Sequence, residues 1–362
     1  MAQANIITFN IGAFISTLFL LESGADKFIA HAAALASRIG ISEVTIGLVT
    51  AGAEWEELAV VVASLAQGRP SLAMGNVIGS AISNILGAFS LGLLCFEGEG
   101  IEFDRSARIY SLLTAVLTTL VVPVVYFPNG IVWLVCGPLL VVVFGMYFLF
   151  VAVAIGRGVL AAPQDSDSES DDDDDDEDDA SSVGSTTGLL ADGSTLRARQ
   201  RRNHHQLLYH GLYLVFGFLA ICLAGYVLSQ AAINTIDQLH TSDMLFGIVV
   251  LAIATTLPEK FIAVMSGRRG HPGILVANSA GSNVFLLTLC CGIIMMDADA
   301  EGGLGRENVT MAELAVLWVS TALFAGTVWF GGRVSRWIGG GMVLGYVGFI
   351  VLEVAVVHKV GD

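Results

Sequence analysis

The chain has 362 residues, of which 54% are hydrophobic and only 14% are charged. This composition excludes an ordinary soluble globular protein and predicts a polytopic membrane protein. The formal net charge of −16 owes much to one acidic run at residues 165–179, so it does not describe the apolar remainder of the chain.

Apolar runs of about 18 residues or more predict membrane-spanning helices. About ten such runs occur, five before the acidic run and five after it, near residues 6–21, 44–66, 71–95, 108–127, 131–155, 207–229, 244–266, 273–296, 311–331 and 337–357. An odd number of spans in each half predicts that the second half is inserted upside down relative to the first. The predicted fold is an all-α membrane protein with about ten transmembrane helices in two inverted five-helix repeats.

Three segments follow from this pattern. Residues 1–157 form the first transmembrane repeat, residues 158–206 form an acidic linker, and residues 207–362 form the second transmembrane repeat. The linker composition cannot supply a core and predicts a disordered tether. A weak regulatory calcium-binding role for the acidic run is the alternative, although it lacks the spaced ligands of an EF-hand loop.

The first apolar run has no basic segment before it, so it is expected to be a retained helix rather than a signal peptide. Residues 28–39 form an amphipathic piece that is expected to lie in the membrane interface, with Lys27 and Arg38 reaching the headgroups. Glu313 and Glu353, near the ends of the last two runs, are also expected at the interface.

Lysine and arginine placement predicts the orientation. With the N-terminus outside, one side carries most of the basic residues, and the other carries only Arg69, Arg306 and Lys359. Both termini are therefore predicted to be non-cytosolic and the central acidic loop cytosolic. The sequence leaves open whether the membrane is the plasma membrane or an endomembrane such as a vacuole.

The five cysteines have no metal or disulfide spacing and are interpreted as small core residues.

The second apolar run holds three glutamates within four residues, Glu54, Glu56 and Glu57. On a helix, Glu54 and Glu57 share a face while Glu56 points elsewhere. An acid in the middle of a membrane helix costs about 2.5 to 3.5 kcal/mol on translocon scales, so it is expected to face a cation, a cavity or a partner. The alternative is a solvated helix end, but the apolar run continues to Ala66.

The third run carries Asn76, Gly79 and Ser80, followed by Asn84. Ser80 and Asn84 lie one helical turn apart, so both can face the acids. A packing role competes with a ligand role, because glycine allows close helix approach and serine or asparagine can hydrogen-bond across helices.

The seventh run contains Ala254-Thr255-Thr256-Leu257-Pro258-Glu259. Proline removes a backbone hydrogen bond, and broken backbone is tolerated in a membrane only inside protein or beside a water-filled site. A broken helix with a carboxylate at the break is typical of a cation site near the midplane. The adjacent Lys260 points about 100° away from Glu259. It could pair with Glu54 or Glu56, or extend to the headgroups.

Seven residues of the second and third runs recur in the seventh and eighth runs at one constant offset without a gap, which predicts an internal repeat. The pairs are Glu57 and Glu259, Ser64 and Ser266, Gly68 and Gly270, Pro70 and Pro272, Asn76 and Asn278, Gly79 and Gly281, and Ser80 and Ser282.

The segment 254–259, followed by Gly281-Ser282-Asn283, resembles the cation/calcium exchanger superfamily, in its sodium/calcium exchanger membrane region family. Glu57 followed by residues 75–80 is similar to the other signature of that family. The resemblance implies ten helices in two inverted repeats. It also implies that the metal is held by two carboxylates and by accessory oxygens, which are Glu57 and Glu259, then Asn84, Ser80, Ser282, Thr255 and Thr256.

The chain departs from the family pattern at three places. Leu286 stands where the family has an acid or amide, Glu56 stands at a proline position, and Ala53-Glu54 replaces a Thr-Ser pair. Losing the two hydroxyls argues against a full set of sodium ligands. We expect Glu54 to supply the acid that Leu286 lacks.

The resulting hypothesis is a secondary antiporter, not an enzyme, that exchanges Ca²⁺ or a similar divalent cation for Na⁺ or H⁺ by alternating access. Its expected partners are these transported cations and the lipid bilayer, with no resident cofactor, no nucleic acid and a monomeric state. The alternatives are an H⁺-coupled exchanger without sodium sites, a cation channel, and a non-transporting calcium-binding membrane scaffold. No P-loop is present in the sequence, which argues against a primary pump.

Overall fold

A computed structural model describes residues 2–38, 54–97, 100–127, 130–157, 193–301 and 309–357. These residues are almost entirely helical, and none of them lies in a strand. Eight of the described helices are long and apolar enough to cross a membrane, or nine spans when one bent pair is included. The all-α membrane fold is confirmed. The ten-span count and the inverted arrangement stay predictions, since residues 44–53 of the second expected span and the acidic run lie outside the described residues.

Among the described residues of the first half, one π-helical stretch interrupts the α-helices. The elements are α1 (Ala2–Arg38), α3 (Trp55–Ala66), α4 (Pro70–Ile82), η1 (Ser83–Phe89), α5 (Ser90–Leu94), α6 (Arg105–Tyr126) and α7 (Gly130–Gly156). The π-helix η1 joins α4 to α5 without a loop, so these three elements form one span over Pro70–Leu94.

The second half is described over residues 193–301 and 309–357. Its elements are α8 (Gly193–Leu239), α9 (Asp243–Leu245), η2 (Phe246–Leu251), α10 (Ala252–Thr255), α11 (Leu257–Arg268), α12 (Pro272–Phe285), η3 (Leu286–Cys290), α13 (Cys291–Glu301), α14 (Met311–Phe330), η4 (Gly332–Val334), α15 (Ser335–Leu352) and η5 (Glu353–Val357). The π-helix η3 follows α12 as η1 follows α4, so the repeat extends to this irregularity.

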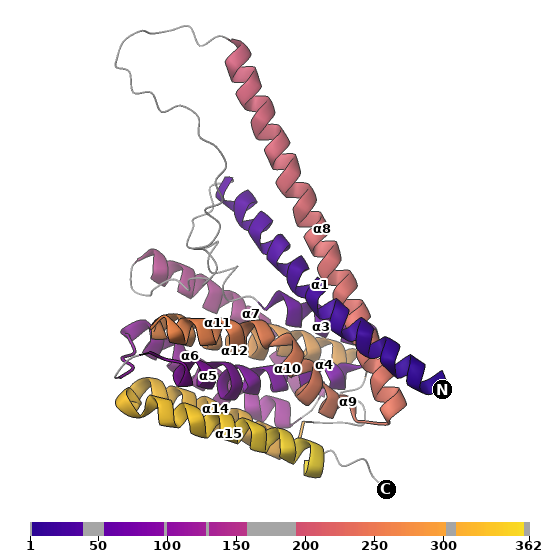
Figure 1. The fold of residues 1–362 in the computed structure, drawn as a ribbon, viewed down its shortest axis with the longest axis vertical. Coiled ribbons are helices and arrows are strands. Elements are labelled where there is room, and N and C mark those ends of the chain that lie inside the picture. The colour runs from indigo at the N-terminus through magenta and orange to yellow at the C-terminus, as the bar shows by residue number, and fades with distance from the viewer. Residues whose placement is uncertain are drawn as a thin grey trace.

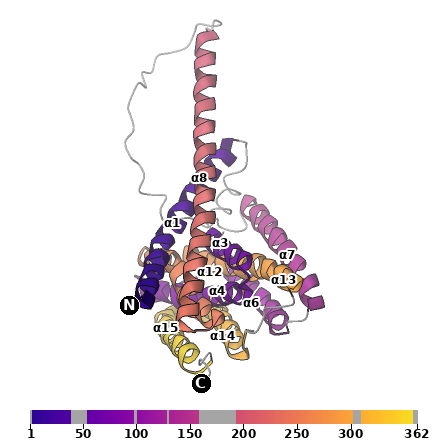
Figure 2. The same ribbon diagram turned by 90° about the vertical axis from the view of Figure 1, so that its right-hand side faces the viewer.

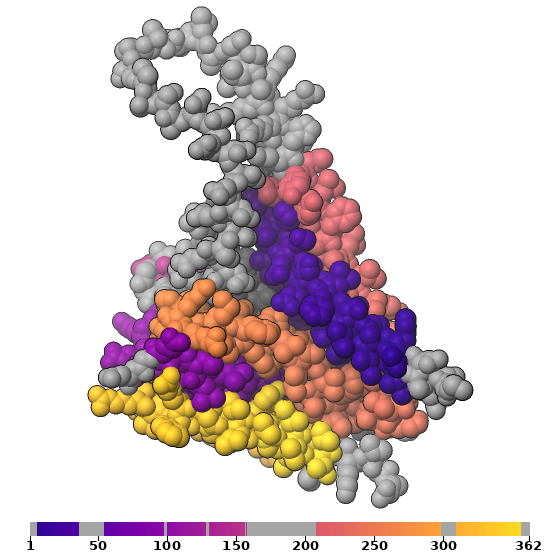
Figure 3. Space-filling model, in the orientation of Figure 1, coloured from indigo at the N-terminus to yellow at the C-terminus, as the bar shows by residue number. Residues whose placement is uncertain are grey.

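Helices α1 and α8 pack along each other, and the upper part of α8 extends away from the remaining helices (Figures 1 and 2). The expected interfacial helix over residues 28–39 is wrong, because α1 runs unbroken from Ala2 to Arg38. Similarly, α8 begins at Gly193, inside the segment assigned to the linker, and continues to Leu239. In the space-filling view the two helices lie over one flank of the other elements (Figure 3).

The centre of the molecule is formed by the spans of α4–α5 and α12–α13. Within the most apolar window of each span, 89% of Pro70–Leu94 and 83% of Pro272–Asp297 is buried, against 11% for the span of α7. Every residue of α4 is buried. A helix that is apolar on all sides is expected in such a position. The small and polar residues of α4 and α12 therefore mostly face other parts of the protein rather than lipid.

Both halves use the same turn before their central helix. Gly68 and Gly270 have φ values of 69° and 72°, in the left-handed region that glycine adopts without strain. In each turn a later amide donates to a serine carbonyl, Arg69 to Ser64 at 3.0 Å and His271 to Ser266 at 2.9 Å. The sequence repeat thus corresponds to a structural repeat at these two turns.

Close backbone contact joins α4 to α9 and η2. A Cβ atom on Gly79 would lie 2.6 Å from the carbonyl oxygen of Ile248, and one on Gly75 would lie 2.7 Å from that of Met244. No side chain fits at these distances, so the two glycines set the separation of the elements. This contact brings the first and second halves together beside the broken span.

Glu313 and Glu353 are both fully buried, at 0% exposure, and their expected place at the membrane interface stays a prediction. Glu313 closes a capping box at the start of α14, where its Oε2 accepts from the Thr310 amide at 2.5 Å and its own amide donates to the Thr310 hydroxyl at 3.4 Å. Its carboxylate is therefore engaged in capping the start of the helix.

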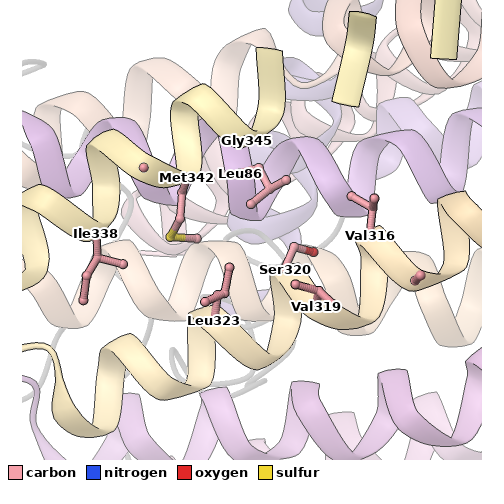
Figure 4. Close-up of a pocket in the computed structure, with 10 residues that line it drawn as sticks. Leu86, Val316, Val319, Ser320, Leu323, Ile338, Met342 and Gly345 are labelled. Carbon is pink, nitrogen blue, oxygen red and sulfur yellow. The ribbon is translucent and has the colours of Figure 1, made fainter. Parts of the chain in front are cut away.

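A groove of about 520 Å³ lies between α14 and α15 (Figure 4). Its walls are formed by Leu86 of η1 and by residues such as Val319, Leu323 and Met342. The one hydroxyl that lines it, Ser320, donates to the carbonyl of Leu317 at 2.8 Å. A cation needs several free oxygens, so this hydrocarbon-lined groove is not the cation site.

Candidate cation-binding site

The two acid-bearing helices start in the same way. α10 ends at Thr255 and α11 begins at Leu257, and the two halves of this span are bent by 48°. Pro258 stands in the first turn of α11, where its missing amide costs no hydrogen bond, and Glu259 follows in the same turn. In α3, Glu54 is the N-cap and Glu57 lies in the first turn. The positive end of a helix dipole favours carboxylates at these positions.

The helix starts bring three carboxylates together. One carboxylate oxygen from each of Glu54, Glu57 and Glu259 lies within 4.8 Å of the other two. Glu57 is 0% exposed and Glu54 is 5% exposed, while Glu259 is half-buried. Within the described part of the chain, this is the one group of three or more metal-ligating side chains. The structure therefore places Glu54 beside Glu57 and joins the glutamates of the two repeats, as the sequence predicts.

The oxygens of this cluster lack donors. Both oxygens of Glu57, and Oε2 of both Glu54 and Glu259, are buried without a hydrogen-bond partner among the described residues. Two unit charges 4 Å apart repel by about 4 kcal/mol even at an effective dielectric constant of 20. A buried acceptor left unpaired costs about 1 to 3 kcal/mol more. Bound cations or protons are needed to offset these costs.

Two of the predicted accessory residues also present free oxygens. Ser80 Oγ and Asn84 Oδ1 are buried and have no partner among the described residues. The Asn84 amide is oriented by Asn283, because Nδ2 of Asn84 donates to Oδ1 of Asn283 at 3.3 Å. Asn283 in turn donates to the carbonyl of Ala81 at 3.0 Å. Asn283 was not among the predicted site residues, although it stands in the Gly281-Ser282-Asn283 motif.

The other predicted accessory residues are placed differently. Thr255 donates to the carbonyl of Leu251 at 3.1 Å within its own helix, and Ser282 is 2% exposed. Leu286, the counterpart of Asn84 in the repeat, is completely buried and brings no oxygen. The side-chain oxygens of the two repeats are therefore unequal, with the first repeat supplying more acceptors.

Lys260 makes neither of the contacts that the sequence left open. Its ammonium donates to Ser83 Oγ at 2.9 Å, to the Thr256 carbonyl at 3.0 Å and to Thr256 Oγ1 at 2.5 Å. No described carboxylate forms an ion pair with it within 4.0 Å. The predicted ligand Thr256 thus holds Lys260 in this structure.

Glu56 lies apart from the three-carboxylate cluster. Its charged neighbours include Asp26 and Glu22 of α1 as well as Glu54. The sequence-based expectation that Glu56 points away from the shared face of Glu54 and Glu57 agrees with this placement. The acids of α3 are thus divided between the cluster and the side that faces α1.

Comparison with known proteins places the chain in a family. The family model described as sodium/calcium exchanger protein matches residues 9–156 and 209–355. The chain belongs to this family. The resemblance drawn from the two signatures is thereby confirmed, and the two matched segments correspond to the two halves on either side of the acidic run.

Relatives of this exchanger-family protein are distant in sequence. It is 27% identical over 316 residues to the proposed antiporter CaxA of Alkalimonas amylolytica, covering 84% of this chain and 88% of the relative. It is 27% identical over 142 residues to the sodium/calcium exchanger MaX1 of Methanosarcina acetivorans, covering 38% and 39% of the two chains. The fold resembles a structure of the sodium-calcium exchanger NCX_Mj, with a TM-score of 0.57 and 17% identity over 95% of this chain and 99% of the other.

Proposed function

We propose that this member of the exchanger family is a secondary antiporter that exchanges Ca²⁺, or a similar divalent cation, for Na⁺ or H⁺ by alternating access. The observation that carries the proposal is the cluster of Glu54, Glu57 and Glu259, whose ligand oxygens lie within 4.8 Å of one another. Ca²⁺ binds oxygens at 2.3 to 2.6 Å, so two of its ligands lie at most about 5 Å apart. Three oxygens no more than 4.8 Å apart lie within about 2.8 Å of a common centre, so one calcium ion can contact all three carboxylates after a shift of a few tenths of an ångström.

The remaining ligands would come from the central helices. Ca²⁺ takes six to eight oxygens as a rule. Asn84 Oδ1 and Ser80 Oγ are buried and unpartnered, so they are the first candidates after the carboxylates. Ser282 and Thr255 are second candidates, since Thr255 already donates to a helix carbonyl but keeps its lone pairs. Glu54 is the carboxylate that offsets the apolar Leu286.

The counter-ion is Na⁺ or H⁺ in this proposal. Three crowded carboxylates can be neutralised by protons as well as by metal ions, which favours H⁺ as an alternative partner. The replacement of two hydroxyl positions by Ala53 and Glu54 weakens a purely sodium-based site. The exchange of one kind of cation for another at the same carboxylates is what couples the two fluxes.

The proposed domain plan keeps the two transmembrane repeats at 1–157 and 207–362, with the linker 158–206 on the cytosolic side and both termini on the other. The support is the placement of lysine and arginine along the chain. Labelling of single cysteines introduced at loop positions, with a reagent that cannot cross the membrane, tests this orientation in intact cells.

Uptake of ⁴⁵Ca²⁺ into proteoliposomes holding the full-length protein tests the function. Uptake is expected only when an outward gradient of Na⁺ or of H⁺ is imposed, and the effective gradient identifies the counter-ion. Uptake without any counter-ion would indicate a channel. Absence of transport, with binding of Ca²⁺ to the purified protein retained, would indicate a scaffold.

A further inference from the structure

The ammonium of Lys260 lies in a pocket built from oxygens. Its three N–H groups have three acceptors, Ser83 Oγ, the Thr256 carbonyl and Thr256 Oγ1. The pocket is formed where α11, η1 and the break after α10 meet. The stem of the lysine passes over Gly87, where an added Cβ would lie only 3.2 Å from Lys260 Cε. The absent side chain at Gly87 thus makes room for the lysine.

Hydrogen-bond counting fixes the roles of the hydroxyls. Tyr346 of α15 donates to Ser83 Oγ at 2.9 Å, and Lys260 also donates to it, so the Ser83 hydroxyl donates to Thr256 Oγ1 at 2.9 Å. Thr256 donates in turn to the carbonyl of Ala252 at 2.6 Å. A hydroxyl has one donor and two acceptor sites. All of these sites are used, so no lone pair is left there for a free ion.

The pocket adjoins the carboxylate cluster. Lys260 follows Glu259 directly in the chain, and the charges of Glu259, Glu57 and Glu54 all act on it. Three carboxylates and one ammonium leave a formal charge of −2 at this place. One divalent cation, or two monovalent ones, neutralises that charge. Without the ammonium, three monovalent cations would be needed.

We propose that Lys260 is a tethered monovalent cation: its ammonium fills an oxygen pocket that a free counter-ion would otherwise take, so that one divalent cation is exchanged for two monovalent ones without net charge. This assignment rests on the antiport proposed above and adds its stoichiometry. The lysine acts as a specificity-determining residue for the counter-ion, since a fixed ammonium cannot leave the pocket with the transported ions. Glu56 is not one of the three clustered carboxylates, although its charge also acts on Glu57 and Glu259. Because it holds neither transported ion in this proposal, it adds the same charge to both loaded states and leaves the stoichiometry unchanged.

Proteoliposomes with a membrane potential clamped by K⁺ and valinomycin test the assignment. For the wild-type protein, the steady-state Ca²⁺ ratio is expected to be independent of potential, with a Hill coefficient of about 2 for the driving ion. In Lys260→Gln, a third counter-ion is expected to enter the pocket. The Hill coefficient then rises to about 3, and the Ca²⁺ ratio changes by about 50-fold per 100 mV because one charge moves per cycle.

Arg268→Gln is the matched control, because it removes a cation from the exposed end of the same helix. It should keep the wild-type Hill coefficient and remain insensitive to potential. A purely structural role for Lys260 predicts slower transport in Lys260→Gln with unchanged voltage dependence, and that result would overturn the assignment. If Lys260→Gln does not fold, Lys260→Met and the wild-type measurement still decide the question.

The two proposals fail in different ways. Wild-type Ca²⁺ uptake that needs a counter-ion but carries net charge would overturn the tethered-cation assignment and leave antiport intact. Wild-type protein that moves Ca²⁺ without a counter-ion, or does not move it, would overturn antiport and the assignment together.

Discussion

Glu57 and Glu259 come from equivalent positions in the two halves of the chain, and their carboxylate oxygens lie within 4.8 Å of each other. Each stands in the first turn of a helix of 12 residues. The site is therefore made by contact between the halves rather than by either half alone. Removing the charge of one glutamate is therefore expected to reduce the electrostatic repulsion on the other.

Glu259→Gln is expected to lower the rate of Ca²⁺ exchange by at least about 100-fold, since removing one charge 4 Å from an ion costs several kcal/mol. Folding should be retained, because the glutamine has the same shape and removes a repulsive charge. Exchange is measured by ⁴⁵Ca²⁺ flux and folding by thermal unfolding in detergent. Glu97→Gln, at an exposed position outside the cluster, serves as the control. Near-normal flux in Glu259→Gln would contradict the ligand role.

Glu54→Ala is expected to cripple Ca²⁺ transport, because Glu54 supplies the third carboxylate of the cluster. Adding Leu286→Asp should restore part of the activity, since it returns an acid to the equivalent place of the other repeat. The measurement is the apparent Ca²⁺ affinity of the single and double variants in the same flux assay. Wild-type affinity in Glu54→Ala, or no gain from the second change, would mean that the site uses other oxygens.

Asn283→Ala is expected to weaken Ca²⁺ binding by roughly 10-fold while leaving a folded protein, because residues that hydrogen-bond to metal ligands typically contribute about 10- to 100-fold to metal affinity. Asn283 holds the Asn84 amide and leaves Oδ1 of Asn84 unpartnered. Calcium affinity of the purified variant can be measured by titration calorimetry. Asn278→Ala, on the same helix but half-buried, gives the comparison. An unchanged affinity would show that Asn84 does not need this support.

Gly79→Ala is expected to destabilise the protein by about 1 to 3 kcal/mol, the usual cost of overpacking a tight contact. The added Cβ would lie 2.6 Å from the carbonyl oxygen of Ile248, which the backbone cannot accommodate without moving. Thermal unfolding of the two variants measures the effect. Gly326→Ala is the control, as nothing lies within 4 Å of a Cβ at that position on α14. Equal stability of both variants would mean that α4 and η2 separate freely.

The apolar runs predicted most of the membrane helices, but the length of α1 was underestimated. The first apolar run was expected to end near residue 21, just before Glu22-Ser23-Gly24. In the structure Gly24 instead lets α1 approach α8, since an added Cβ would lie 3.1 Å from that of Ala220. A glycine that breaks a helix and a glycine that packs two helices look the same in one sequence. The difference depends on a partner from the other half of the chain.

The candidate site was predictable to a similar degree. The repeat and the cost of buried charge pointed to Glu57, Glu259 and Glu54, and the structure brings these three together. The hydrogen-bond partners of Lys260 could not be predicted from the sequence. Helix geometry gives the direction of the Cα–Cβ bond, but it does not give the position of the ammonium at the end of a flexible four-carbon side chain. Asn283 was missed for a related reason, as its partner Asn84 lies in the other repeat.

The equal lengths of α3 and α11 have a consequence for the work done by the membrane voltage. A helix of 12 residues is about 18 Å long, which is roughly half the thickness of a bilayer. Each helix runs from a cluster glutamate to its glycine turn, at Gly68 or at Gly270. With the two turns on opposite faces, as the inverted repeat predicts, an ion at the carboxylates lies about equally deep from either side. The electric field then acts over similar distances on loading from one face and on release to the other.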